Sequence, residues 1–594
     1  MRLPLGLLPI VAAARKPSVL VLLGDDIGWG DVSYNGGAAL TRHIDAWAAA
    51  PGSITFQDAH SGGTVCSPTR ATILTGRNHF RDCVDYVYDC SDPTECDPGF
   101  PFAQTGTFTI ADAAKAAGHR SFFAGKWHLG SFYADAPYPS SPLVHGFDRM
   151  HATLEVAPTA TTNCMCSAAW NASCEFGHDG GPEHCTGGFA AGGPDGCCFN
   201  YWFEDNRSEH GVGNMTRPSH AIDAVEVQQS LSAFLKTVDD DAGFVAQLSF
   251  HNCHIPFVGA AATVAACRDG DGCLPENRQG QPKTNYSAAQ LDFYACLLEL
   301  DAAVGAVLRD LRDFKRYDDT LVYFTTDNGP EGDGPRGTRI FSPTSTVSTR
   351  ALMLRSENST RALDPSKNRP NRLLTPKPVV DVHSGNCGPT GFCDADHFAT
   401  WPGDAAQLRG RKRDLFEGGH RVPTVASWPA VVGDVNRVSW ATVGTTDLLP
   451  TVLDVLGVSR PEAQADWPLD GRSLAPLFRG AADWPAPRAT ALAFHDWPPN
   501  SGRGYAYRVG SVKLVVGSTS CDDCPLPMLF DLADDLEEQH DLAARYPDLV
   551  DELQANFSAW AESVTRSRAV ESACPAGAPY SNGLPAVHLG WAGA

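Results

Sequence analysis

The chain is poor in basic residues. Its 594 residues include 46 Lys and Arg against 69 Asp and Glu, which gives a formal net charge of −23. An acidic surface repels a phosphate backbone, so the composition argues against nucleic acid as a partner. It also gives no general attraction to an anionic substrate. A pocket that binds an anion must therefore gather its own lysines, arginines, histidines or metal ions.

Long hydrophobic runs are also missing. Beyond residue 14 no apolar stretch approaches the roughly 20 residues that span a bilayer, so we expect no transmembrane segment. Residues 1–14 combine Arg2 with a short apolar stretch and small residues near Ala14. This pattern is typical of a secretory signal peptide. We therefore expect a soluble protein of the secretory pathway, either extracellular or lysosome-like.

Cysteine, in contrast, is abundant, with 19 residues. Such a number favours disulfides and an oxidising compartment. With Cys66 set apart, the remaining 19 − 1 = 18 form an even number that could all pair. N-x-S/T glycosylation sequons agree with this compartment and lie at Asn171, Asn206, Asn214, Asn285, Asn358 and Asn556.

The length of the chain favours more than one domain. We predict a main domain over residues 15–484 and a smaller α+β domain over residues 485–594. A cysteine- and glycine-rich insertion at about 160–200 interrupts the main domain, where disulfides are favoured over zinc. A second insertion, at about 331–405, is rich in Pro, Ser, Thr and Gly and is interpreted as a surface lid or rim.

Short apolar runs alternate with helical patterns in the main domain. The predicted buried strands cover residues 18–23, 120–124, 244–250 and 320–326. The predicted helices cover residues 108–117, 222–238, 288–314 and 446–456. This alternation predicts an α/β fold with a large, mainly parallel sheet sandwiched by helices.

Polar side chains follow each of these strands at its carboxyl end. They are Asp25 and Asp26, Lys126 and His128, His251 and His254, and Asp327 and Asn328. Ligands bind at this edge of open α/β sheets. The oxygen ligands of Asp25, Asp26, Asp327 and Asn328 suit Ca²⁺ or Mg²⁺ rather than a soft metal. Each pair alone could be a turn-capping cluster, but their convergence favours a site.

A separate run opens with Cys66 and continues Ser67-Pro68-Thr69-Arg70. Pro68 suits a first helical turn, and Gly76 suits a helix end. We therefore expect Cys66 to begin a short helix, where free N–H groups and the helix dipole attract an anion. On this pattern alone, Cys66 could equally be a structural cysteine.

The Cys66–Arg70 run matches a C-x-P-x-R signature, and with other segments it resembles the type I, formylglycine-dependent sulfatases of the alkaline phosphatase-like superfamily. The other segments are residues 24–31 (GDDIGWGD), 125–130 (GKWHLG), 254–256 (HIP), 326–329 (TDNG) and 408–423, with L-R-G-x-K and E-G-G-x-R-V-P. The resemblance covers most of residues 17–460. The chain departs from the family's pattern after Gly146-Phe147-Asp148, where other members place a polar residue.

The resemblance implies an alkaline phosphatase-like fold and an arylsulfatase-like sulfuric ester hydrolase. It implies that a formylglycine-generating enzyme oxidises Cys66 to formylglycine, whose hydrate attacks sulfur. The implied metal is Ca²⁺, with Mg²⁺ as the alternative, held by Asp25, Asp26, residue 66, Asp327 and Asn328. The implied catalytic residues are Cys66, Arg70, Lys126, His128, His254 and Lys412: the lysines bind sulfate, Arg70 orients the aldehyde hydrate, His254 protonates the leaving alcohol and His128 receives a proton.

The expected substrate is a sulfated small molecule or carbohydrate. Two alternatives stay open at this point. A phosphonate or phosphodiester hydrolase of the same fold would use the same aldehyde on phosphorus. A non-catalytic, secreted, cysteine-rich glycoprotein would keep the fold for binding, although every main catalytic position is occupied here.

Overall fold

The structure of the chain is a computed structural model. It describes residues 15–87, 106–130, 140–153, 202–204, 214–216, 222–254, 257, 259–269, 273, 286–332, 403–481, 492–495, 504–517 and 527–571. The predicted signal peptide, the insertion at 160–200 and nearly all of the 331–405 insertion lie outside the described residues.

A mixed sheet of ten described strands forms the centre of the molecule. In spatial order the strands are β11 (Arg437–Ser439), β2 (Ser53–Phe56), β10 (Thr424–Ser427), β9 (Thr320–Thr326), β1 (Ser18–Gly24), β8 (Phe244–Ser249), β4 (Arg120–Lys126), β5 (Arg149–Thr153), β6 (Trp202–Glu204) and β7 (Asn214–Thr216). The five strands from β9 to β5 are parallel, whereas β10 and β6 join their neighbours antiparallel. The predicted fold class is confirmed, including all four predicted central strands.

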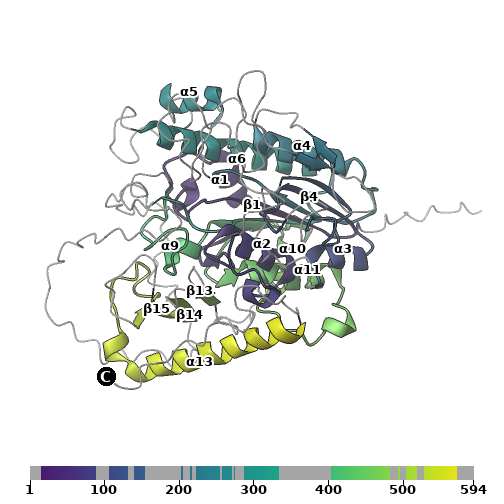
Figure 1. Cartoon of the computed structure of the whole chain (residues 1–594). Coiled ribbons are helices and arrows are strands. Elements are labelled where there is room, and N and C mark those ends of the chain that lie inside the picture. Colours follow the sequence, from purple (N-terminus) through teal and green to yellow (C-terminus); the bar gives the residue numbers. More distant parts are fainter. Residues whose placement is uncertain are drawn as a thin grey trace, which may run out of the picture.

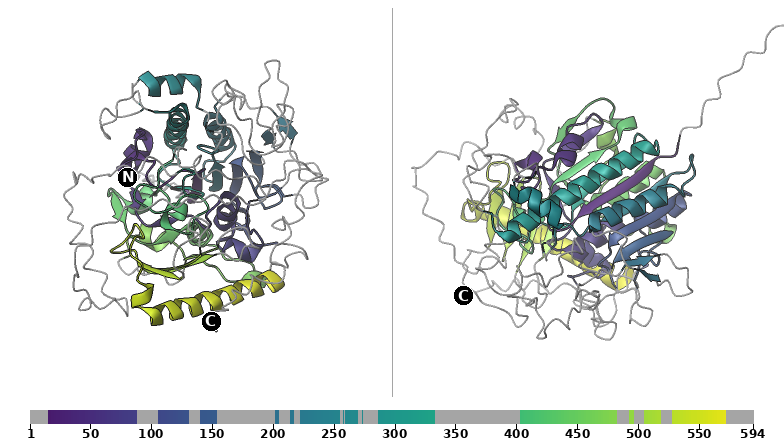
Figure 2. Two further views of the ribbon diagram at one scale, coloured as in Figure 1. Left: turned by 60° about the vertical axis from the view of Figure 1, so that its left-hand side comes forward. Right: turned by 90° about the horizontal axis from the view of Figure 1, so that it is seen from above.

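Helices cover both faces of the sheet (Figures 1 and 2). Alternate residues of β1 point to the two layers: Leu20 and Leu22 join one hydrophobic core, and Val19 and Val21 join the other. The first layer contains α1 (Arg42–Ala48), α4 (Asp223–Leu235), α5 (Ala261–Asp269) and α6 (Ala288–Asp313). The second contains α2 (Cys66–Thr75), α3 (Ile110–Ala116), α10 (Pro429–Val432), α11 (Leu448–Leu456) and α12 (Ala475–Phe478).

Local sequence explains where the helices begin. Ser287 caps α6 by accepting a hydrogen bond from the N–H of Gln290, and Thr109 caps α3 in the same way with Asp112. The remaining short elements are β3 (Ala59–His60), which pairs with β12 (Val443–Gly444), the 3₁₀ turns Ser33–Asn35, His79–Asp82, Thr445–Asp447, Glu462–Gln464 and Ala543–Arg545, and the four-residue α9 (Glu417–His420). Among the described helices, none has the length and apolar character that a membrane span requires.

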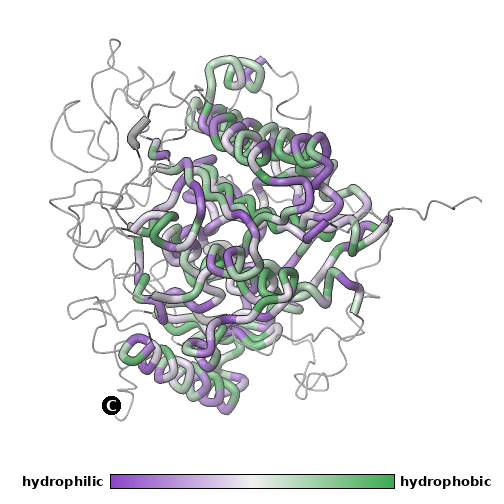
Figure 3. Tube along the Cα trace, turned by 90° about the vertical axis from the view of Figure 1, so that its right-hand side faces the viewer, coloured by the Kyte–Doolittle hydropathy of each residue, from purple (hydrophilic) through white to green (hydrophobic). Residues whose placement is uncertain are grey.

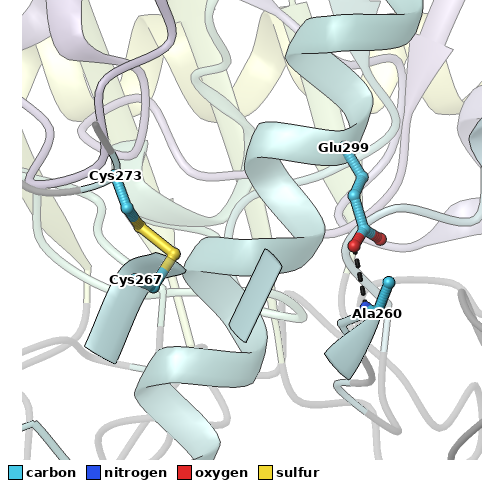
Figure 4. Close-up of a disulfide and its surroundings, with 4 residues drawn as sticks. All are labelled: Ala260, Cys267, Cys273 and Glu299. Carbon is cyan, nitrogen blue, oxygen red and sulfur yellow. Dashed lines mark hydrogen bonds between the residues drawn. A yellow bond between two sulfur atoms is a disulfide. The ribbon is translucent and has the colours of Figure 1, made fainter. Parts of the chain in front are cut away.

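A disulfide between Cys267 and Cys273 ties the end of α5 to the following chain (Figure 4). Just before α5, the Glu299 carboxylate accepts a hydrogen bond from the N–H of Ala260. Cys253 and Cys296 are buried free thiols. These two are among the eighteen cysteines that could have paired, so not all of those eighteen form disulfides in this structure. Both thiols lie in the apolar layer around α6, where cysteine behaves as a small hydrophobic side chain.

The C-terminal part forms a second, antiparallel sheet. Its strands are β13 (Leu492–His495), β14 (Tyr505–Val509), β15 (Val512–Val516) and β16 (Met528–Asp531). Helix α13 (Pro547–Arg566) packs on it, with Phe557 stacked on Tyr505 at 3.7 Å between ring centroids. Hydrophobic and hydrophilic residues alternate along this helix (Figure 3). The helix continues as a π-helix, Ser567–Glu571.

Buried ion pairs join the C-terminal sheet to Asp58, just before β3, and to Glu417 of α9. Arg508 of β14 binds Asp58 with both terminal guanidinium nitrogens, Nη2 at 2.7 Å and Nη1 at 3.0 Å. Lys513 of β15 lies 3.1 Å from Glu417 and 2.8 Å from Glu538. All these side chains are buried, and a buried charge that loses its partner is costly. The two sheets therefore depend on each other.

We expect Arg508→Met to destabilise the fold by up to about 3–5 kcal/mol, because it removes the bidentate partner of the buried Asp58 carboxylate and leaves it only Arg421 and His60. The matched control is Arg479→Met. Arg479 also pairs with an aspartate, Asp454, at 2.9 Å, but its side chain is 49% exposed. This control should cost less than about 1 kcal/mol. Urea unfolding of both variants tests the difference, and equal losses would contradict it.

Candidate active site

The site begins at the first turn of α2. Val65 precedes the helix in extended conformation, Cys66 is its first residue, and Gly76 ends it with a left-handed φ of 65°. Pro68 lies in the first turn, where its missing N–H costs no hydrogen bond. The predicted helix is confirmed. Cys66 is buried, at 1% exposure.

Two strand ends bring the acidic residues to Cys66. Gly24 of β1 pairs with Thr326 of β9, so Asp25 and Asp327 leave neighbouring strands side by side. Asp26 has a left-handed φ of 55°, and this turn of the backbone ends the strand alternation that would send adjacent side chains to opposite faces. The N–H of Asp26 contacts Asp327 Oδ1 at 3.3 Å, and Asn328 Nδ2 donates to Asp26 Oδ1 at 2.6 Å.

Cations from three separate segments neutralise these carboxylates. Arg70 Nη2 lies 2.6 Å from Asp327 Oδ2 and 3.2 Å from Asp25 Oδ2. Lys126 Nζ lies 2.6 Å from Asp25 Oδ2. Lys412 Nζ lies 2.8 Å from Asp26 Oδ2.

The thiol and the histidines lie among these charges. Cys66 Sγ is 3.6 Å from both Asp25 Oδ1 and Lys126 Nζ. His254 Nε2 is 3.2 Å from Lys412 Nζ. His128 lies two residues beyond Lys126, and its carbonyl accepts a hydrogen bond from Ser67 Oγ at 2.6 Å. The structure thus brings together the residues that the sequence assigned to catalysis and metal binding: Asp25, Asp26, Cys66, Arg70, Lys126, His128, His254, Asp327, Asn328 and Lys412.

Burial and charge act against each other on the carboxylates. Burial raises the pKa of Asp25, but Lys126 and other nearby cations outweigh it and hold that pKa well below its usual value. For Asp26, burial prevails over Lys412 and raises the pKa to about 7. Burial also raises the pKa of Asp327, with Asp25 adding to the effect. A further cation beside Asp26 and Asp327 would therefore stabilise their charged forms.

Burial also shifts the pKa values of Cys66, His254 and His128. It raises the pKa of the Cys66 thiol well above its ordinary value. Burial together with nearby lysines lowers the pKa of His254 and of His128 well below the usual histidine range. The unmodified thiol is therefore protonated at neutral pH, and both imidazoles are neutral.

The donor set fits a divalent metal ion. Single ligand atoms of Asp25, Asp26, Cys66 and His254 all lie within 4.8 Å of one another. Asn328 Oδ1 is buried and has no hydrogen-bond partner among the described residues, as expected of an oxygen that ligates a cation. Carboxylate and amide oxygens are the ligands that hard cations prefer.

Two glycines allow Lys412 to reach the site. A Cβ added to Gly418 would lie 2.1 Å from the carbonyl oxygen of Gly410, and one added to Gly419 would lie 2.1 Å from that of Asp414. Only glycine permits this approach of α9 to the 409–414 loop. The E-G-G part of the motif is thus explained by backbone packing against the loop that carries Lys412.

Glu331 is a further site residue that the sequence motifs do not include. This buried carboxylate lies 3.1 Å from Lys412 Nζ and 2.6 Å from Arg413 Nη1. Burial raises its pKa, but Arg413 and Lys412 outweigh burial and hold the pKa well below its usual value. Its position three residues after Asn328, on the loop that follows β9, was the available signal. Glu331 orients Lys412 toward Asp26.

Buried carboxylates, paired lysines and a helix start meet at the carboxyl edge of the sheet. This fold and site define a metal-dependent hydrolase of anionic esters. Residues 17–458 match the family described as Sulfatase. The chain therefore belongs to the sulfatase family, and it is a sulfatase, an enzyme that hydrolyses sulfate esters.

Curated relatives agree with this assignment, and a solved structure shares the fold. The chain is 26% identical to arylsulfatase A of Bos taurus, over 93% of this chain and 87% of the relative. It is 24% identical to N-acetylgalactosamine-6-sulfatase of Canis lupus familiaris, over 91% and 84%. The fold matches the PsFucS1 sulfatase of Pseudoalteromonas sp. with a TM-score of 0.62, 19% identity and coverage of 93% and 91%.

We expect a divalent cation to stabilise the protein, because it binds the folded site and not the unfolded chain. At 100 times its Kd, it should add about 2.7 kcal/mol to the free energy of unfolding. Asp25→Asn should remove most of this gain, whereas Asp454→Asn, a carboxylate-to-amide change on α11, should leave it intact. Thermal unfolding after chelation and after addition of Ca²⁺ or Mg²⁺ measures the effect. An equal response of all three proteins would contradict the site.

Proposed function

We propose that this sulfatase cleaves its ester through formylglycine, which a formylglycine-generating enzyme makes from Cys66. The observation that carries the proposal is the position of Cys66 at the start of α2, 3.6 Å from both Asp25 and Lys126. Because burial raises the pKa of the thiol, an unmodified Cys66 would be a poor nucleophile at neutral pH. Oxidation of Cys66 to formylglycine would replace this poor nucleophile with an aldehyde hydrate.

When formed, formylglycine supplies a hydrated aldehyde with one hydroxyl to attack sulfur and a second to release sulfate as the aldehyde returns. A cation held by Asp25, Asp26, residue 66, Asp327 and Asn328 would make the attacking hydroxyl more acidic. Ca²⁺ is the preferred ion because it accepts several carboxylate and amide oxygens, and Mg²⁺ is the alternative.

The cationic residues bind and orient the sulfate group. Lys126, 3.6 Å from Cys66, and Lys412, 2.8 Å from Asp26, offer positive charge to its oxygens. Arg70 donates to Asp25 and Asp327 and so holds both metal-binding carboxylates beside the helix start. Fixed charges of this kind favour the transition state without reorganisation.

Two histidines move the protons. Lys412 lies 3.2 Å from His254 Nε2, so this pair holds a proton for the departing alcohol. A bound sulfate would raise the pKa of His254 and favour its protonated form. His128 Nδ1 has no hydrogen-bond partner among the described residues, and the neutral ring can accept the proton of the second hydroxyl.

The proposed substrate is a sulfated carbohydrate or a sulfated small molecule. A carbohydrate is supported by the name of the N-acetylgalactosamine-6-sulfatase relative. It is also supported by a solved structure of the same fold in complex with k-i-k-neocarrahexaose, with a TM-score of 0.61. With a formal charge of −23, the protein must attract such an anion by local cations alone.

We also propose a secretory destination, extracellular or lysosome-like, and the domain division at about residue 485. The Cys267–Cys273 disulfide and the exposed sequon residue Asn556 on α13 support an oxidising, glycosylating compartment. We include in this proposal that the protein binds calcium, is glycosylated and carries a signal peptide at residues 1–14.

Mass spectrometry of the peptide that contains Cys66 tests the nucleophile. In protein made together with the maturation enzyme, residue 66 should carry the aldehyde rather than the thiol. Protein of the same sequence made without that enzyme is the control and should be inactive. Cys66→Ala should lose turnover and keep its fold. An unmodified thiol in active protein would overturn the formylglycine proposal, and a fully inactive but modified protein would favour a non-catalytic glycoprotein.

A comparison of aryl sulfate with aryl phosphodiester and phosphonate esters tests the reaction. We expect the aryl sulfate to give the higher kcat/KM, because two lysines face the transferred group. The variant Lys412→Met should lower kcat/KM for the sulfate by on the order of 10²-fold. Faster cleavage of the phosphorus esters by the wild-type enzyme would assign the site to a phosphonate or phosphodiester hydrolase instead.

A further inference from the structure

Beside the candidate active site, three buried side chains form a hydrogen-bonded chain that the proposed reaction does not use. His251 follows β8; its Nδ1 lies 2.8 Å from Asp223 Oδ2, and its Nε2 lies 2.6 Å from Thr153 Oγ1. Asp223 is the first residue of α4, and Thr153 is the last residue of β5. The chain therefore ties three segments that are distant in the sequence.

The ring of His251 is held in one orientation. A carboxylate accepts hydrogen bonds, so Nδ1–H donates to Asp223, and in the neutral ring Nε2 accepts from the Thr153 hydroxyl. The ring is fully buried, and Trp202 meets it edge to face at 6.1 Å between centroids. Rotation of the ring would break both hydrogen bonds inside the protein, where neither could be replaced by water. His251 is thus unable to meet a substrate directly.

The backbone of His251 positions His254. The carbonyl of His251 accepts a hydrogen bond from the N–H of His254 at 2.8 Å. Between them, the carbonyl of Asn252 and the N–H of Cys253 bond to the backbone of Asp25 at 2.8 and 2.6 Å. The turn that carries His254 is therefore held from one side by Asp25 and from the other by the side chain of His251.

The backbone of Thr153 positions the second histidine segment. Thr153 pairs with Lys126 across β4 and β5, and its carbonyl accepts a hydrogen bond from the N–H of Trp127 at 3.0 Å. His128 follows directly. A single residue thus holds the His128 segment through its carbonyl and the His254 segment through its hydroxyl and His251.

We propose that Asp223, His251 and Thr153 form a positioning chain that sets the distance between the two active-site histidines. This proposal rests on the proposed function, in which His254 serves the leaving alcohol and His128 serves the second hydroxyl. None of the three residues touches the reacting atoms. They act through His254 and His128. Thr153 connects the His254 segment, which its hydroxyl contacts through His251, with the His128 segment, which its carbonyl contacts through Trp127.

The test compares three variants of the mature enzyme. Thr153→Val keeps the shape and the backbone carbonyl but removes the hydroxyl that binds His251. Thr153→Ser restores that hydroxyl. Thr320→Val is the matched control: Thr320 is a fully buried strand threonine whose hydroxyl donates to the Arg316 carbonyl at 2.7 Å, and it lies at the opposite end of β9 from Asp327.

We expect Thr153→Val to lower kcat on an aryl sulfate about tenfold, because a displaced proton donor slows the chemical step. KM should change less than about twofold, since the groups that bind sulfate are untouched. Thr153→Ser and Thr320→Val should keep kcat within about twofold of the wild type. A normal kcat in Thr153→Val, an equal loss in Thr153→Ser or Thr320→Val, or a loss confined to KM would overturn the positioning role.

A second readout does not depend on turnover. In protein with ¹³C-labelled histidine, the His254 ring signal, assigned with His254→Gln, should shift in Thr153→Val and stay in place in Thr153→Ser and Thr320→Val. An unmoved His254 signal in Thr153→Val would overturn the proposal. If the wild-type enzyme hydrolyses no sulfate ester, the proposed function fails on that result alone, and the NMR shift still decides whether the chain positions His254.

Discussion

The neutralisation of three buried carboxylates governs the structure of this protein. Asp25, Asp26 and Asp327 lie at the ends of adjacent strands with no exposure to solvent. Buried charges of one sign are tolerated only with partners, so cations must arrive from elsewhere in the chain. Arg70 comes from α2, Lys126 from β4 and Lys412 from a loop near residue 410. The same requirement produces the function, because these charges surround Cys66 and create a place for an anion beside a metal ion.

The loop with Lys412 shows how far this requirement extends through the fold. Glu331 orients Lys412. The backbone of Gly418 and Gly419 packs directly against the 409–414 loop that carries this lysine. Glu417 and His420, which flank these two glycines, bind Lys513 of the C-terminal sheet. The smaller sheet thus completes the support of a residue in the catalytic site, although it provides none of the residues that the site collects.

Much of the fold and most of the site could be predicted from the sequence, because the relevant signals are local. Four apolar runs marked the central strands, and polar residues at their ends marked the catalytic edge. The short antiparallel strands β2 and β10 gave no comparable pattern. Glu331 was missed because a single acidic residue in a loop is usually solvated. Thr153 was missed because its importance comes from two contacts, with Trp127 and His251, that only the pairing of β4 with β5 creates. Cys253 and Cys296 show the limit of counting: an even number of cysteines says nothing about which of them are buried as thiols.

The sequence by itself determined the chemical inventory: a cysteine at a helix start, hard oxygen ligands, two lysines and two histidines at strand ends. These follow from short motifs and from the rule that parallel strands end at one edge. Only the tertiary structure decided which atoms meet. It turned Asp26 back with a left-handed φ so that adjacent aspartates serve one site, directed His254 toward Lys412, and directed His251 away toward Asp223. The physical reason is that long-range hydrogen bonds and charge pairing, rather than local patterns, select the side-chain directions.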